Sequence, residues 1–278
     1  MQKRSLEISC YVVGLGAFGV FFRWLQDQLA FDEAGLAERS VFNLLVPLLL
    51  LGSAVLFVRF VNAAQEEKLY VPKDFCDALF NPGRLFAFFR WAIGLTMCAG
   101  GVMLLVTSET DKNVEMMRAL SVLGVLSGLS FPLLLAEANY EEIEHLALAR
   151  LYSVMPVALF SVWLVTSYIE NAYNSVVWSY AIEVITICVA MMAFFRVAGF
   201  VYFVVDSRKC LINIMLGAVM CIMSVADERY MGMQLMLISA ACMLLMYNWI
   251  FILNMKKKKP RPKDQDGAPS EDGFEHLS

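Results

Sequence analysis

The sequence predicts an all-helical protein that crosses a membrane about eight times, and three observations support this fold class. Hydrophobic residues make up 59% of the 278 residues and charged residues only 17%, whereas a typical soluble domain has about 25% charged residues. The hydrophobic residues fall in runs long enough to cross a hydrocarbon core of about 30 Å as helices. The basic residues gather on one side of the predicted bundle, as the positive-inside rule requires.

Eight hydrophobic segments follow one another along residues 1–255, which we predict to form one transmembrane domain. The first begins after a basic N-terminus. The sequence RWLQDQ that follows it lacks the small residues of a signal-peptidase site, so we expect an uncleaved helix. The seventh segment is the shortest, and removing it would change the topology. The predicted spans are residues 8–28, 41–61, 84–107, 117–137, 150–168, 176–205, 210–226 and 231–254.

The distribution of basic residues predicts that both termini are cytoplasmic. With eight spans in this orientation, all but five of the 22 Lys and Arg residues lie at or near the cytoplasmic side. The loops assigned to the outside are short and acidic. We therefore expect a multi-pass protein of the plasma membrane. The five basic residues on the outer side are Arg23, Arg39, Lys112, Arg118 and Arg229.

Two cytoplasmic segments are longer than tight loops. Residues 62–83 contain Pro72 and Pro82, and we expect a short helix at the membrane interface there. Residues 256–278 are charged and rich in Pro and Gly, which predicts a disordered tail. The lysines at the start of the tail are interpreted as a topology signal, with binding of anionic lipid as the alternative. These lysines are Lys256, Lys257, Lys258 and Lys259.

Two motifs suggest chemistry that their context does not support. GLGAFG, at residues 14–19, matches a dinucleotide fingerprint but lies inside a predicted span, where small residues allow close helix contact. In EANYEEIEH, at 137–145, Glu142 and His145 have the spacing of a carboxylate-bridged metal site. Since the only other histidine is His276, we interpret 137–145 as a solvated acidic face that could contact a basic partner.

The sequence offers little evidence for an enzyme. It contains no HExxH, GxSxG or P-loop motif and no paired Cys/His constellation, which argues against a hydrolase, metalloprotease or ATPase. A membrane enzyme with another kind of site is not excluded. We expect no metal, no cofactor and no nucleic-acid partner.

Proline residues inside the predicted spans are candidates for broken helices. Pro47, Pro132 and Pro156 each remove a backbone donor, and transporters use the carbonyls that such breaks expose to bind substrates or ions. In GLSFP, at 128–132, Ser130 and Pro132 are therefore candidate binding residues. An ordinary proline kink is the alternative.

Three arginines lie near the cytoplasmic ends of their predicted spans. By helical rise, Arg59, Arg90 and Arg196 reach the membrane boundary, where a long side chain can snorkel into the headgroups. We interpret them as interfacial anchors, with an anion site as the alternative. Glu137 is predicted at the same boundary.

Glu183 is the charge that the sequence explains least well. It lies about 10 Å below the outer surface by helical rise, and a carboxylate at such a depth is by default a functional-site hypothesis. Three roles remain open: a member of a structural ion pair, a proton carrier, or a ligand for a cation or amine. Arg23 reaches nearly the same depth in the first span, so we predict that it pairs with Glu183.

Two functions remain. The first is a small-solute or proton-coupled transporter, favoured by Glu183, the membrane prolines and the lack of extramembrane catalytic parts. The second is a membrane-embedded sensor or a partner subunit of a larger membrane complex, favoured by residues 137–145, residues 62–83 and the tail. A cavity that reaches Glu183 would favour transport. A solid bundle with a cytoplasmic docking face would favour the second function.

Overall fold

The computed structural model describes residues 2–29, 42–67, 69–81, 83–108, 113–139, 146–171, 177–227 and 229–257. Eight helices within these ranges are long and apolar enough to cross a membrane. The predicted class, an all-helical multi-pass membrane protein, is therefore confirmed. The eight helices are α1 (Gln2–Leu29), α2 (Phe42–Glu66), α4 (Arg84–Thr107), α5 (Val114–Glu137), α6 (Leu146–Asn171), α7 (Val177–Val201), α8 (Ser207–Met223) and α9 (Met231–Leu253).

The helix of the seventh hydrophobic segment, α8, is the shortest of the eight. It continues into the 3₁₀ turn η1 (Ser224–Ala226), so that the apolar span runs from Ser207 to Ala226. At 1.5 Å per residue its 20 residues cover about 30 Å, which is the thickness of the hydrocarbon core.

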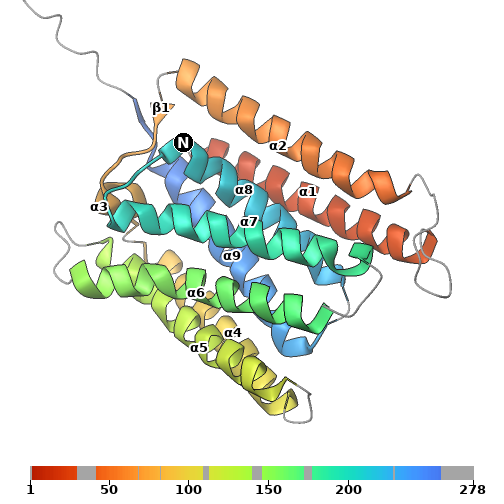
Figure 1. Ribbon diagram of the computed structural model, residues 1–278. Coiled ribbons are helices and arrows are strands. Elements are labelled where there is room, and N and C mark those ends of the chain that lie inside the picture. The colour runs from red at the N-terminus through yellow and green to blue at the C-terminus, as the bar shows by residue number, and fades with distance from the viewer. Residues whose placement is uncertain are drawn as a thin grey trace, which may run out of the picture.

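Six of the helices close a ring of contacts in chain order. Each helix from α4 to α8 packs against the next, and α9 closes the ring by packing against α4. Helix α1 lies outside the ring against α8 and α9, and α2 lies outside it against α1 and α8. Figure 1 shows α1 and α2 together along one side of the molecule and α4 and α5 along the other.

The spanning helices alternate in direction, so the bundle has two ends. We call the end that holds the N-terminus the N-terminal end and the other the far end. At the N-terminal end, Arg4 near the start of α1 pairs with Glu67 just after α2. At the far end, Arg23 late in α1 pairs with Asp227 just after η1.

The segment between α2 and α4 folds against the N-terminal end. It contains the strand β1 (Leu69–Tyr70) and the short helix α3 (Phe75–Leu79), which confirms that residues 62–83 hold a short helix. Its side chains Val71, Phe75 and Leu79 are buried. Figure 1 shows β1 and α3 at the same end as the N-terminus.

The chain that leaves α9 is tied to this segment. β1 pairs antiparallel with β2 (Lys256–Lys257), and Asn254 donates to the carbonyls of Ala78 and Phe80 at 2.9 Å each. The first two residues that we assigned to the tail are thus part of a small sheet. Residues 258–278 lie outside the described residues.

Glycines set the closest helix contacts. A Cβ atom at Gly16 would lie 2.8 Å from the Ile222 side chain, and one at Gly19 would lie 2.9 Å from Met223. Both partners belong to α8. The GLGAFG motif therefore serves close packing of α1 on α8, as predicted from its place inside a span.

Aromatic side chains fill the axis of the ring along much of its length. From the N-terminal end, Phe251 contacts Tyr247, Tyr247 contacts Phe194 and Phe194 contacts Phe160, with ring centroids 5.5–6.5 Å apart. Phe160 stacks on Trp163 at 5.8 Å. All five are at most 2% exposed. This chain of rings leads from the N-terminal end to the charged residues described next.

Candidate functional site

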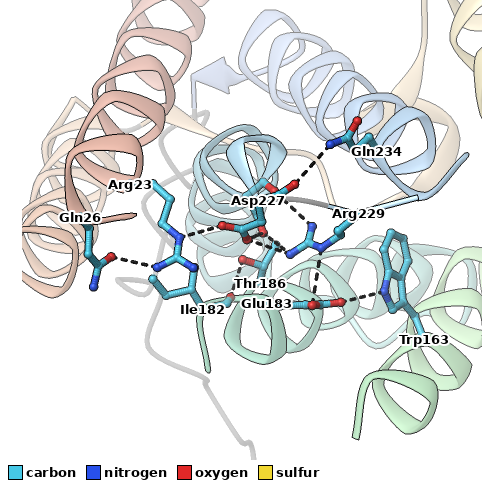
Figure 2. Close-up of polar contacts among 10 residues, drawn as sticks. Arg23, Gln26, Trp163, Ile182, Glu183, Thr186, Asp227, Arg229 and Gln234 are labelled. Carbon is cyan, nitrogen blue, oxygen red and sulfur yellow. Dashed lines mark hydrogen bonds and ion pairs between the residues drawn. The ribbon is translucent and has the colours of Figure 1, made fainter. Parts of the chain in front are cut away.

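Four charged side chains from different parts of the chain meet at the far end. Arg23 Nε of α1 lies 2.7 Å from Asp227 Oδ1, and Arg229 Nη2 lies 2.9 Å from Asp227 Oδ2. Arg229 Nε lies 3.5 Å from Glu183 Oε2 of α7. Figure 2 shows Asp227 between the two arginines, with Glu183 beyond Arg229. We call these four residues the far-end network.

The far-end network is largely removed from solvent. The side chains of Arg23 and Arg229 are 4% and 6% exposed, and those of Asp227 and Glu183 are 11% and 17% exposed. Two cations and two anions balance each other, which offsets part of the high cost of removing each charge from water. A buried cluster of this kind is uncommon within a membrane domain and marks the region as a functional-site candidate.

Uncharged polar groups complete the coordination of the far-end network. Gln26, one turn after Arg23, accepts from Arg23 Nη1 at 2.9 Å. Ser224 Oγ donates to Asp227 Oδ2 at 2.9 Å, and Trp163 Nε1 donates to Glu183 Oε1 at 3.3 Å. The network therefore connects α1, α6 and α7 with the chain between α8 and α9 (Figure 2).

The connection between α8 and α9 is short and folds inward, which positions two of the four charges. Arg229 Nη1 donates at 3.1 Å to the carbonyl of Ser224, in the turn that ends α8. A cation is favourable there because the carbonyl end of a helix carries partial negative charge. Gln234 in the first turn of α9 donates at 3.2 Å to the carbonyl of Asp227. These bonds hold the connection against both helices.

The links of the far-end network differ in strength. Both Asp227 contacts are short and have hydrogen-bond geometry to Arg23 Nε and Arg229 Nη2. The contact between Arg229 Nε and Glu183 is longer, and this Nε has no hydrogen-bond partner in the part of the chain that the structure describes. Glu183 is therefore the most loosely held of the four charges.

The predicted direct pair between Arg23 and Glu183 is wrong. Arg23 pairs with Asp227, and Glu183 pairs with Arg229. Both predicted residues nevertheless belong to the same network, because helical rise places them at similar depth. Arg229 was predicted only as an outer-side basic residue, and Asp227 was not singled out, because both lie in a connection where depth cannot be counted along a helix axis.

Pro132 lies in the contact between α4 and α5, and Ser130 lies two residues before it on α5. Helix α5 is continuous through Pro132, so the expected break is not present. Ser130 donates to the carbonyl of Ser127 at 2.8 Å, and both Ser130 and Pro132 are buried. The carbonyl that Pro132 leaves without its helical donor belongs to Gly128. A Cβ atom at Gly94 of α4 would lie 2.5 Å from this oxygen, so the freed carbonyl faces a glycine backbone.

The four boundary residues predicted at the cytoplasmic side all lie toward the N-terminal end. Arg59 is exposed, whereas Arg90, Arg196 and Glu137 are half-buried. Among the described residues, the Nε atoms of Arg90 and Arg196 and one carboxylate oxygen of Glu137 are buried without a hydrogen-bond partner.

The lysines predicted to meet lipid are only partly described. Lys256 Nζ lies 2.8 Å from Asp77 Oδ2, and this hydrogen bond raises the pKa of Lys256. Lys257 belongs to β2, and Lys258 and Lys259 lie outside the described residues. The same is true of Glu142 and His145. Among the residues that the structure describes, no group of three His, Cys, Asp or Glu residues could hold a metal ion.

Three grooves lined by described residues lie away from Glu183. One lies among α1, α4 and α9, a second between α1 and α2, and a third beside β1 and α3. Glu183 lines none of these three. Comparison with protein-family models, with curated proteins and with solved structures gives no match.

Proposed function

We propose that the protein transports a small solute across the plasma membrane, and that the far-end network is the gate on the outer side. The observation that carries this proposal is the burial of four ionisable side chains at one end of the helix ring. Ionisable residues inside membrane domains commonly mark ion or substrate pathways. The N-terminal end is cytoplasmic in this proposal, in accordance with the distribution of basic residues.

The physical chemistry of buried ion pairs supports a gate rather than a simple brace. Removing charges from water costs about as much as their attraction returns, so a buried pair adds little net stability compared with a well-packed apolar contact. An ion pair between separate helices can, however, be exchanged for water when those helices part. The far-end network joins α1 and α7 to the α8–α9 connection and would have to break if they separated.

Glu183 lines none of the three grooves, so the proposal requires this structure to be a closed state, in which aromatic rings fill the pathway. The aromatic rings from Phe251 to Trp163, some stacked and one pair edge to face, lie buried between the helices, and Trp163 donates to Glu183. A closed state of a transporter requires both a filled axis and a sealed end. Opening would require the rings to change rotamer or the helices to tilt, as in hinge and shear motions.

Proton coupling would act through Glu183. It is held by one indole N–H and one ion pair at 3.5 Å, so its protonation would release the weakest link of the network. Asp227 would remain bound to both arginines. Opening on protonation would then begin between α7 and the α8–α9 connection.

The experiment measures access to Cys221, a fully buried thiol one turn before Ser224 on α8. A variant that retains only Cys221 is placed in vesicles and treated with a membrane-impermeant thiol reagent from the far-end side. Asp227→Asn should accelerate labelling at least about tenfold, because each 1.4 kcal/mol or so removed from the closed state shifts the population by about that factor. Glu183→Gln should act in the same direction.

A variant that retains only Cys210 is the matched control. This thiol is equally buried in α8 but lies at the N-terminal end, so its labelling from the far-end side should not change. General unfolding would expose both thiols, so unchanged labelling of Cys210 separates gating from a loss of stability. Slow labelling of Cys221 in folded Asp227→Asn protein would contradict a gate and remove the main support for transport.

The second candidate function is a partner subunit or sensor in a larger membrane complex. The contacts that join β1 and α3 to the end of α9 favour it, because they make an ordered surface at the N-terminal end. These contacts are the pairing of β1 with β2 and the hydrogen bond from Asn254 to the Ala78 carbonyl. A groove beside it is lined by Lys73, Asp74, Asp77 and Lys256. A subunit of this kind would keep Cys221 inaccessible in every folded variant, so the same experiment separates the two functions.

A further inference from the structure

A groove of about 560 Å³ runs between α1 and α2 toward the N-terminal end. Its walls are mostly apolar and include Tyr11 of α1 and Leu56 and Phe57 of α2. Arg4, Glu7 and Arg59 add charge to the lining. The groove therefore has an apolar wall that could hold an acyl chain and a charged part that could meet a headgroup.

The two arginines of the groove differ in their partners. Arg4 is fixed, because its Nη1 lies 2.5 Å from Glu67 Oε2 and its guanidinium lies 5.6 Å from the centre of the Phe60 ring. Arg59 is exposed and makes no hydrogen bond or ion pair within the described part of the chain. A cation near the membrane boundary without a protein anion is available to an anion from the bilayer.

The depth of Arg59 matches a lipid headgroup. It lies eight residues before Glu67, or about 12 Å by helical rise, and Glu67 pairs with the start of α1 at the bundle end. An arginine stem can span much of this distance by snorkelling along the apolar wall toward the headgroups. Basic pockets between membrane helices at this depth bind anionic lipid headgroups.

The geometry points to a binding site for one anionic glycerophospholipid in this groove, in the leaflet that meets the N-terminal end. The phosphate lies against Arg59 and Arg4, and one acyl chain lies along Tyr11, Leu56 and Phe57. Arg59 is the cation of the lining that could meet the phosphate, since Arg4 already pairs with Glu67 and Arg59 pairs with no residue in the described part of the chain. This site is separate from the lysines at residues 256–259 and does not depend on transport.

Glu7 provides an internal comparison. Glu7 lines the same groove, and no ion pair joins it to Arg59 in the described residues. Its negative charge would therefore repel a lipid phosphate. Neutralising Glu7 should therefore strengthen lipid binding, and neutralising Arg59 should weaken it. Substitutions at these two positions are expected to act in opposite directions, which a general loss of folding cannot imitate.

The experiment uses the purified full-length protein and native mass spectrometry. Dioleoylphosphatidylglycerol and dioleoylphosphatidylcholine are offered in equal amounts, and the bound fraction of each is measured. The wild type should retain one phosphatidylglycerol in preference to phosphatidylcholine. Arg59→Gln should weaken its retention about fivefold, the contribution expected of one basic residue at a membrane surface. Glu7→Gln should strengthen retention.

Arg84→Gln is the matched control, because Arg84 is also an exposed arginine near the N-terminal end but does not line the groove. It should leave the retained phosphatidylglycerol unchanged. Equal retention in Arg59→Gln and wild type, or an equal loss in Arg84→Gln, would overturn the proposal. So would a dimer of this chain that Arg59→Gln dissociates, because a second copy would then occupy the groove.

Discussion

At the residue scale, Asp227 is the centre of the far-end network. One of its carboxylate oxygens accepts from Arg23 and the other accepts from Arg229 and Ser224. No other member of the network bonds both arginines. Loss of this carboxylate would remove the one anion of the network that contacts both largely buried arginines.

Double-mutant cycles should therefore assign the main coupling to Arg23 and Asp227. Arg23→Leu and Asp227→Leu are each expected to lower the free energy of unfolding by about 3–5 kcal/mol, because each removes one partner of a largely buried ion pair. The double mutant should be less destabilised than the sum. The coupling energy between Arg23 and Glu183 should be smaller, since the two do not touch. Unfolding in detergent by denaturant measures all of these.

The exposed pair of Arg118 and Glu115 is the control for this cycle. Its side chains are 53% and 90% exposed at 3.3 Å, and pairs of this kind contribute at most about 1 kcal/mol. Equal coupling energies in the two cycles would mean that the far-end network is solvated. A larger coupling for Arg23 with Glu183 than with Asp227 would restore the direct pair that the sequence suggested.

Two members of the far-end network, Arg23 and Glu183, were predicted from the sequence as site residues, and Asp227 and Arg229 were not. The difference has a physical reason. Arg23 and Glu183 stand out because each interrupts a hydrophobic run, where a charge is expensive. Asp227 lies in a short acidic stretch between two runs, where charges are ordinary. Only the fold shows that this stretch turns inward and that Arg229 accompanies it.

At the element scale, the contact between α4 and α5 is set by backbone approaching backbone. A Cβ atom at Gly94 would lie 2.5 Å from the Gly128 carbonyl oxygen and 3.0 Å from Pro132 Cδ. Neither neighbour is the flexible end of a side chain. The two helices can approach this closely only because both positions are glycine.

Gly94→Ala should therefore lower the free energy of unfolding by about 1–3 kcal/mol, the usual cost of overpacking. Gly14→Ala is the control, because a Cβ atom there would meet nothing within 4 Å. It should be neutral or stabilise α1 by up to about 1 kcal/mol through helix propensity. Thermal unfolding of both variants in the same detergent makes the comparison. Equal effects would mean that α4 and α5 separate easily.

The start of α8 provides a pH-dependent test. Asp206 caps this helix by accepting from the backbone N–H of Lys209 at 3.2 Å, and it pairs with Lys209 Nζ at 2.9 Å. The Lys209 side chain and then its backbone N–H lower the pKa of Asp206. Because this pKa is lowered in the folded state, the ionised Asp206 carboxylate stabilises the fold. Its contribution to the free energy of unfolding is complete above the ordinary pKa of about 3.9 and is lost as pH falls below that value.

Asp206→Ala should lower stability by about 1 kcal/mol near neutral pH, through loss of the cap. The difference from wild type should shrink as pH falls below about 4, where the wild-type carboxylate becomes protonated. Asp206→Asn should retain most of the cap without this pH dependence. The melting temperatures of the three proteins are measured from about pH 3 to about pH 7, a range that includes the ordinary pKa of an aspartate. A constant difference between Asp206→Ala and wild type would contradict the role of the carboxylate.

Element positions were predictable because hydrophobic length is a strong signal in a membrane chain. All eight segments coincide with helices, including the seventh, whose span the turn at Ser224–Ala226 completes. The effect of Pro132 was not predictable, because a proline can either break a helix or be absorbed within it. Here the Gly94 backbone accommodates the freed carbonyl, and α5 continues.

At the scale of the whole molecule, three distant parts of the chain meet at the N-terminal end. Arg4 pairs with Glu67, β1 pairs with β2, and Lys256 pairs with Asp77. The N-terminus, the segment around α3 and the end of α9 must therefore lie on the same side of the membrane. This follows from the contacts alone, whichever side it is. The distribution of basic residues predicts that this side is the cytoplasm.

Reporter fusions test these two statements separately. Fusions after Phe80 and at the C-terminus must agree with each other, because β1, α3 and β2 lie at one end. Both should report the cytoplasm, and fusions within residues 108–116, between α4 and α5, should report the outside. Agreement between the first two with the opposite orientation would keep the fold and overturn the assignment of the far end to the outside. The proposed gate would then close the cytoplasmic side. Disagreement between them would mean that the chain crosses the membrane an odd number of times between α3 and β2, which is incompatible with the ring of six helices from α4 to α9.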